Sequence, residues 1–267
     1  RVEMGVPTAV KEASEEAFEG GELKERVLKV IQANPSGIKL SQIGKVLGIA
    51  FIRAAKPIQE LLAEMTNLVR SQLTKGEEAI MNNDHALALE VVAKEKRVNA
   101  LELKIDRDCE NIIALFNPVA IDLRFILATL KINTNLERIG DNADGIARYI
   151  IDLKKPFDTD LVEKYQLPIM FHTAVTMLDD TIASLVNEDS KLARKVLDKD
   201  EKLNNINREA TEVTLDLIKT SPERAEQFLL LLSIIRKLER VGDQAKNIAE
   251  EIIFYVEAKV LKHKKKE

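Results

Sequence analysis

The chain of 267 residues is 45% hydrophobic and 31% charged and carries a formal net charge of −4 at pH 7, which is typical of a folded globular protein and not of a disordered one. The small negative charge argues against a chain-wide attraction for nucleic acid, and the scarcity of Gly, Pro and aromatic residues favours helices. Because there is a single cysteine, Cys109, a disulfide framework and a thiolate metal site are both excluded, and we expect a cytoplasmic protein.

The first part of the chain is expected to contain a leader followed by short helices. Residues 1–21 are acidic and irregular and are predicted to form a flexible leader. Residues 22–57 contain three helical segments. The second is predicted to end at Gly48, and the third to have Pro57 near its start, where a missing N–H is tolerated. This succession resembles a small helix-turn-helix or winged-helix-like module.

Two basic residues make DNA the first partner to consider for this module. Arg53 and Lys56 lie at the start of its third helix, which is the recognition helix of such modules. They are few for neutralising phosphates, however, and no pair of wing-forming strands is visible after Leu68. A helical hairpin used for docking or for forming a homodimer is therefore the alternative.

After residue 57 the pattern changes to long amphipathic helices, with apolar residues recurring at helical spacing. Asn117–Pro118 and Ser221–Pro222 are each predicted to be an N-cap followed by proline at the first helical position. The longest apolar run, residues 228–235, is too short to cross a bilayer. The helices are expected near residues 58–82, 85–116, 118–154, 161–187, 190–219 and 222–262.

The two halves of this helical region repeat each other. Sixteen residues from Asn135 align without a gap with sixteen from Lys237, and nine of them are identical. KEKRVN from Lys94 likewise matches KDEKLN from Lys199. We therefore predict an all-α fold of two repeated three-helix bundles lying side by side. The predicted organisation is bundle 1 at 58–156, bundle 2 at 157–262 and a basic tail at 263–267.

The third helix of each half carries two acids, four residues apart, with a glycine between them. Acids at this spacing share one helix face, and their repulsion costs about 0.2–0.5 kcal/mol. A glycine in a helix interior costs about 1 kcal/mol relative to alanine. Because both penalties occur in both halves, some interaction is expected to offset them, and a hard cation bound by the acids is one candidate. The residues concerned are Glu137, Gly140 and Asp141 in the first half and Glu239, Gly242 and Asp243 in the second.

The second helix of each half offers matching oxygen ligands. Glu95 and Asn99 are four residues apart, as are Asp200 and Asn204. If the second and third helices pack antiparallel, each half presents four oxygen ligands, a set that suits magnesium, calcium, manganese or iron. The alternative is a solvated acidic face neutralised by arginines, in which the glycines serve only close helix contact.

These motifs resemble the PhoU family, regulators of phosphate uptake in bacteria and archaea. LERIGD from Leu136, LERVGDQAKNIAEEI from Leu238 and NPVAIDLRFILATLKI from Asn117 carry the resemblance, which covers roughly residues 58–260. It implies two three-helix bundles whose acidic motifs bind metal ions, with iron clusters among the known occupants. The implied ligands are Glu95, Glu137, Asp141, Asp200, Glu239 and Asp243. Asn99 and Asn204 depart from the acid that the family more often has there, and Gly145 departs from an asparagine.

The resemblance also implies a regulator without a reaction of its own. Such a protein is an adaptor between the ATPase of a phosphate ABC transporter and a phosphate-sensing histidine kinase. Two other functions stay open: a phosphate-responsive DNA-binding regulator that uses the N-terminal module, and the cytosolic domain of a sodium–phosphate cotransporter.

Overall fold

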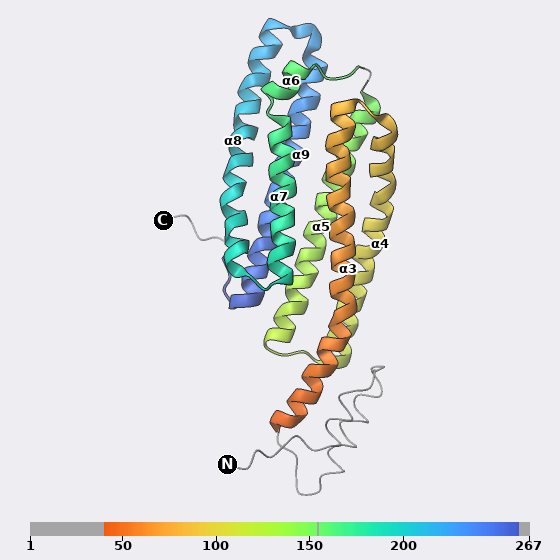
Figure 1. The fold of residues 1–267 in the computed structure, drawn as a ribbon, viewed down its shortest axis with the longest axis vertical. Coiled ribbons are helices and arrows are strands. Elements are labelled where there is room, and N and C mark those ends of the chain that lie inside the picture. Colours follow the sequence, from red (N-terminus) through yellow and green to blue (C-terminus); the bar gives the residue numbers. More distant parts are fainter. Residues whose placement is uncertain (1–39, 154, 262–267) are drawn as a thin grey trace, which may run out of the picture.

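The computed structural model describes residues 40–153 and 155–261, which form a group of long helices aligned along one direction (Figure 1). Every element in this part of the chain is helical, so the predicted all-α class is confirmed. The elements are α3 (Leu40–Asn82), α4 (His85–Phe116), α5 (Ile121–Asp152), α6 (Thr159–Lys164), α7 (Leu167–Val186), α8 (Ser190–Thr220), the 3-10 turn η1 (Pro222–Arg224) and α9 (Ala225–Glu257).

The helices form two bundles of three, in the predicted order. α3, α4 and α5 make bundle 1 and α7, α8 and α9 make bundle 2, with successive helices antiparallel in each (Figure 1). The third helices of the two bundles, α5 and α9, pack against each other, and α3 packs against α7. The two repeats therefore lie side by side, and both acidic motifs are on the helices that join them.

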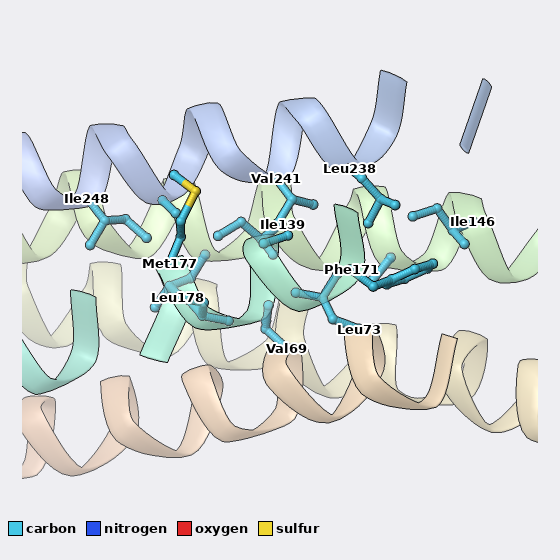
Figure 2. Close-up of a cluster of buried hydrophobic side chains, with 14 of the residues drawn as sticks. Val69, Leu73, Ile139, Ile146, Phe171, Met177, Leu178, Leu238, Val241 and Ile248 are labelled. Atoms are coloured by element: carbon cyan, nitrogen blue, oxygen red, sulfur yellow. The ribbon is translucent and has the colours of Figure 1, made fainter. Parts of the chain in front are cut away.

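One continuous hydrophobic core spans both bundles. Figure 2 shows Val69 of α3, Ile139 of α5, Phe171 and Leu178 of α7 and Val241 of α9 gathered between the helices. All five side chains are fully buried. Burying each stabilises the fold by about 1.5–3 kcal/mol, so the core fixes α5 and α9 relative to each other.

Helix α7 owes its apolar composition to this core. Among the described residues it is the only helix long and apolar enough to cross a membrane. It nevertheless packs against α3, α8 and α9 and buries Met170, Phe171, Ala174 and Met177 completely. Such a composition is that of a helix surrounded by others in a bundle.

Aspartates start the second helix of both bundles. Asp84 accepts a hydrogen bond from the backbone N–H of Leu87 at 2.9 Å, and Asp189 accepts bonds from the N–H groups of Lys191 and Leu192. Such caps satisfy backbone donors that have no partner within the helix and contribute about 1 kcal/mol each.

The two predicted Asn/Ser–Pro caps have different outcomes. Asn117 ends α4 in a left-handed conformation with φ 47°, and α5 begins only at Ile121, so its prediction as an N-cap was wrong. Asparagine tolerates this conformation better than most residues and therefore serves as a C-cap. Ser221 does precede a helical turn that begins with Pro222, although the turn is 3-10 and the serine side chain makes no capping bond.

The predicted helix boundaries before bundle 1 were wrong. α3 runs unbroken from Leu40 to Asn82, through both Gly48 and Pro57. Tertiary packing outweighs their low helix propensity, because Phe51 is buried and its ring meets that of Phe125 edge-on at 6.3 Å between centroids. The predicted boundary between residues 57 and 58 falls inside this helix, and residues 22–39 lie outside the described residues.

The structure describes one of the two predicted DNA contacts. Lys56 is exposed on α3, 3.9 Å from Glu60 in an ion pair one helical turn away. The side chain of Arg53 lies outside the described residues. DNA binding by these residues stays a prediction.

Candidate functional site

The acidic motifs lie near the middle of the two helices that join the repeats. α5 carries Glu137, which is half-buried, and Asp141, which is exposed, whereas both acids of α9, Glu239 and Asp243, are half-buried. The second-helix acids are far more enclosed: 8% of Glu95 is exposed on α4 and 3% of Asp200 on α8. Each repeat therefore combines one buried carboxylate with two nearer the surface.

In repeat 1, Glu95 is only partly satisfied by the protein. Its Oε2 accepts a hydrogen bond of 3.0 Å from Nε2 of Gln72, a fully buried residue of α3. Its Oε1 is buried and has no hydrogen-bond partner. Burial raises the pKa of the Glu95 carboxyl and the Gln72 bond opposes this; the negative charges of Asp141 and Asp144 raise it further, and the positive charge of Arg148 lowers it. The carboxylate form of Glu95 is therefore short of compensating charge.

Glu137 is the acid whose protonation this cluster changes most. Its pKa is raised to about 7, chiefly by burial and then by the charges of Asp141, Glu102 and Glu95. Glu102 lies on α4 and also has a raised pKa, through burial and the charges of Asp106 and Asp141. Repeat 1 thus holds a surplus of interacting carboxylates.

Glu102 and Asp106 belong to this cluster although the sequence analysis missed them. They follow Glu95 by seven and eleven residues, spacings that keep a side chain on one helix face. Asn133 of α5, fully buried, donates to the Asp106 carboxylate at 2.8 Å and to the Glu102 backbone carbonyl at 2.9 Å. That helical spacing was the signal available in the sequence.

The glycines of the two motifs lie where the third helix is in close contact with its neighbours. A Cβ on Gly140 would stand 3.1 Å from Oε2 of Glu95 and 3.2 Å from Cγ1 of Val98. A Cβ on Gly242 would overlap Cδ1 of Leu203. The close helix contact weighed as an alternative is therefore what both glycines provide.

In repeat 2 the buried acid has a cationic partner. Oδ2 of Asp200 accepts hydrogen bonds from Nζ of Lys246 at 2.7 Å and from Nδ2 of Asn204 at 3.2 Å, while its Oδ1 is buried without a partner. Burial and the charge of Asp200 raise the pKa values of Glu239 and Asp243, and the Lys246 charge opposes this. The bond to Asp200 raises the pKa of Lys246.

The structure brings together most of the predicted ligands, but not as a closed metal site. Glu95, Glu137 and Asp141 influence one another in repeat 1, as do Asp200, Glu239 and Asp243 in repeat 2. Asn99 is exposed on α4 and makes no hydrogen bond to these acids. Across residues 40–153 and 155–261, no group of three or more His, Cys, Asp or Glu side chains gathers closely enough to hold a metal ion.

The fit of a cation to these residues differs between the repeats. Oxygen ligands that carry surplus negative charge suit a hard cation. Repeat 1 has that surplus and a buried, unpartnered carboxylate oxygen on Glu95, although its acids would have to move closer together. Repeat 2 already holds the ammonium of Lys246 against its buried acid.

The protein is all-α and consists of two antiparallel three-helix bundles, each with an acid–glycine–acid motif on its third helix. These features place it in the class of doubled helical-bundle proteins. The sequence model of the PhoU domain matches residues 62–150 and 167–252. The chain belongs to the PhoU family.

Individual relatives agree with this assignment. The chain is 31% identical over 216 residues to the phosphate-specific transport system accessory protein PhoU homolog of Zymomonas mobilis, a match that covers 81% of this chain and 90% of the relative. The crystal structure of PhoU from Pseudomonas aeruginosa matches with a TM-score of 0.74 and 27% identity, over 78% of this chain and 100% of that one. The phosphate transport system regulatory protein PhoU from Streptococcus pneumoniae shares the fold, with a TM-score of 0.72 and 23% identity over 79% of this chain and 99% of that one.

Proposed function

We propose that this protein is a non-catalytic regulator of phosphate uptake and phosphate signalling. In this role it is an adaptor that contacts the ATPase of a phosphate ABC transporter and a phosphate-sensing histidine kinase. Membership of the PhoU family supports the proposal, as does the name of its Zymomonas mobilis relative, an accessory protein of the phosphate-specific transport system.

An apolar surface at one end of bundle 1 is the observation that carries the adaptor role. Ile113, Leu115, Val119 and Ile121 are all exposed at the connection from α4 to α5. The corresponding connection in repeat 2, residues 221–224, is SPER and therefore mostly polar. Since the repeat fold does not require apolar residues there, their exposure favours contact with another protein.

The only cysteine also supports a role without covalent catalysis. Cys109 is fully buried, and burial together with nearby acids raises the pKa of its thiol to about 12. A thiol in this state is neither ionised nor accessible at neutral pH, so it does not act as a nucleophile.

The acidic clusters supply the second part of the proposal, the binding of a multivalent cation such as iron, manganese, magnesium or calcium. In repeat 1 the holding residues would be Glu95, Glu137 and Asp141. The raised pKa of Glu137, about 7, reflects the mutual repulsion and burial of these acids. A bound cation would neutralise them and hold α4 against α5.

A binding assay with a matched pair of variants tests the adaptor role. Leu115, 54% exposed, lies in the apolar surface, whereas Leu215, 56% exposed, lies on α8 away from it. We expect Leu115→Asp to weaken binding to the purified transporter ATPase or kinase by about tenfold or more, and Leu215→Asp to leave it unchanged. The adaptor role is rejected if the wild-type chain binds neither partner.

A further inference from the structure

The two acidic clusters are equivalent in sequence position but not in charge. Three residues after the second acid of the motif, repeat 1 has Asp144 and repeat 2 has Lys246. The repeats have thus diverged from acid to base at one position beside the candidate ligands.

In repeat 2, Lys246 acts as a built-in cation. Its side chain is 36% exposed, yet its Nζ lies 2.7 Å from Oδ2 of Asp200, which is almost completely buried. The positive charge also lowers the pKa values of both Glu239 and Asp243 from what burial alone would give. The buried acid of this repeat therefore has a cationic partner within the protein, although its Oδ1 lacks a hydrogen-bond partner and the pKa values of Glu239 and Asp243 stay raised.

In repeat 1, the corresponding residue adds negative charge. Asp144, whose side chain is only 13% exposed, pairs with the exposed Arg148, and its Oδ2 accepts a bond of 2.6 Å from the arginine Nε. The guanidinium bonds to Asp144 and also lowers the pKa of Glu95 through its charge, but Glu95 retains a buried Oε1 without any hydrogen bond. Asp200 also has a buried oxygen without a partner, but its other oxygen bonds to an ammonium, whereas Glu95 bonds only to the neutral amide of Gln72. A buried carboxylate that lacks a bonded cationic partner is costly and favours an additional cation.

We propose that the repeats neutralise their acidic clusters differently: repeat 1 takes up a multivalent cation from solution through Glu95, Glu137 and Asp141, whereas Lys246 replaces that cation in repeat 2. The chain then has one site that exchanges cations with the solution, in repeat 1, and an equivalent position in repeat 2 that the Lys246 ammonium occupies. This inference rests on the cation binding proposed above. It adds that binding is confined to bundle 1, because a cation beside Asp200 would have to displace Lys246 and would be repelled by it.

Manganese binding by matched double variants tests the inference. The full-length chain is freed of metal with a chelator, titrated with Mn²⁺ and monitored by electron paramagnetic resonance of the free ion, with elemental analysis after desalting. We expect Glu137→Gln with Asp141→Asn to remove nearly all bound Mn²⁺, and Glu239→Gln with Asp243→Asn to retain it. Equal losses in the two variants would overturn the inference.

A charge swap at the divergent position gives the reciprocal test. Asp144→Lys is expected to weaken Mn²⁺ binding by at least about tenfold, since it places a like charge beside the site. Lys246→Asp is expected to double the bound Mn²⁺ by opening repeat 2. If circular dichroism shows that Lys246→Asp is unfolded, the titration is made with Lys246→Met instead, which keeps the aliphatic part of the side chain.

The outcomes separate this inference from the function on which it rests. Cation uptake by both repeats of the wild type, or no gain from a folded Lys246 variant, overturns the asymmetry and leaves the regulator role and its cation binding intact. No Mn²⁺ uptake by the wild type rejects cation binding and the asymmetry together. The ATPase and kinase binding assay decides the adaptor role in either case.

Discussion

Replacing Gly242 by alanine tests whether the glycines in the acidic motifs exist for close helix contact. A Cβ at this position would overlap Cδ1 of Leu203, a fully buried side chain of α8. Alanine gains about 1 kcal/mol of helix propensity over glycine, whereas forcing a buried side chain out of its place costs about 1–3 kcal/mol. We therefore expect Gly242→Ala to lower the free energy of unfolding by about 1 kcal/mol.

Gly76 provides a matched control on α3. It also lies inside a long helix, but a Cβ there would meet no atom within 4 Å. Gly76→Ala should therefore realise the propensity gain and raise the free energy of unfolding by about 0.5–1 kcal/mol. Opposite signs for the two substitutions are the expected result, measured by urea denaturation followed by far-UV circular dichroism.

A double-mutant cycle makes the cause specific. In a Leu203→Ala background the obstructing Cδ1 is absent, so Gly242→Ala should lose its penalty and resemble Gly76→Ala. If Gly242→Ala instead stabilises the wild-type protein as much as Gly76→Ala does, the close contact does not explain this glycine.

Three further outcomes are expected. Cys109, fully buried and with a pKa of about 12, should react with a thiol reagent only when the protein unfolds, and fast labelling of the native protein would contradict its placement. The pKa of Glu137 rises on folding from 4.5 to about 7, so the folded state binds this proton more tightly, and stability should fall as pH increases through that window. Glu137→Gln should reduce this fall in the free energy of unfolding by about 1 kcal/mol, because solvent screens the charge of a half-exposed group. Urea denaturation at several pH values measures the effect. Lys246→Met should destabilise the metal-free protein by about 1–3 kcal/mol at neutral pH because it leaves the buried Asp200 carboxylate without its cation, and an unchanged melting curve would show that Lys246 does not stabilise Asp200.

Much of the fold could be predicted because its helices are long and its sequence is doubled. The segments expected at 85–116 and 190–219 agree with α4 and α8 to within a residue. The failure lies at Gly48, which was predicted to end a helix, and at Pro57, which was predicted to lie near a helix start, because α3 runs through both. Local preference for these residues amounts to about 1–3 kcal/mol, and burial of neighbouring apolar side chains such as Phe51 exceeds it.

The candidate site was predictable in part, for geometric reasons. Repeat comparison found the acids of α5 and α9 and the buried acids Glu95 and Asp200. Spacing alone placed Asn99 with Glu95, but four residues turn a helix about 40° beyond a full turn, and Asn99 is exposed. Gln72 lies on a helix without the motif, so its bond to Glu95 requires the packing of α3 on α4.

Lys246 shows most clearly what the sequence could not reveal. The substitution of lysine for the acid of repeat 1 is visible in the aligned repeats, but its meaning depends on where the ammonium lies. Only the packing of α9 on α8 places Nζ against Asp200. Tertiary packing therefore decides whether an acidic cluster needs a cation from solution or already contains a lysine ammonium.

Anomalous diffraction from crystals grown with Mn²⁺ would test the central claim most directly. The asymmetric neutralisation of the two repeats predicts anomalous density beside Glu95, Glu137 and Asp141. It predicts none beside Asp200, where the Lys246 ammonium should remain in hydrogen-bonding contact. Equal density in both repeats, or density beside Asp200 alone with Lys246 turned away, would contradict it.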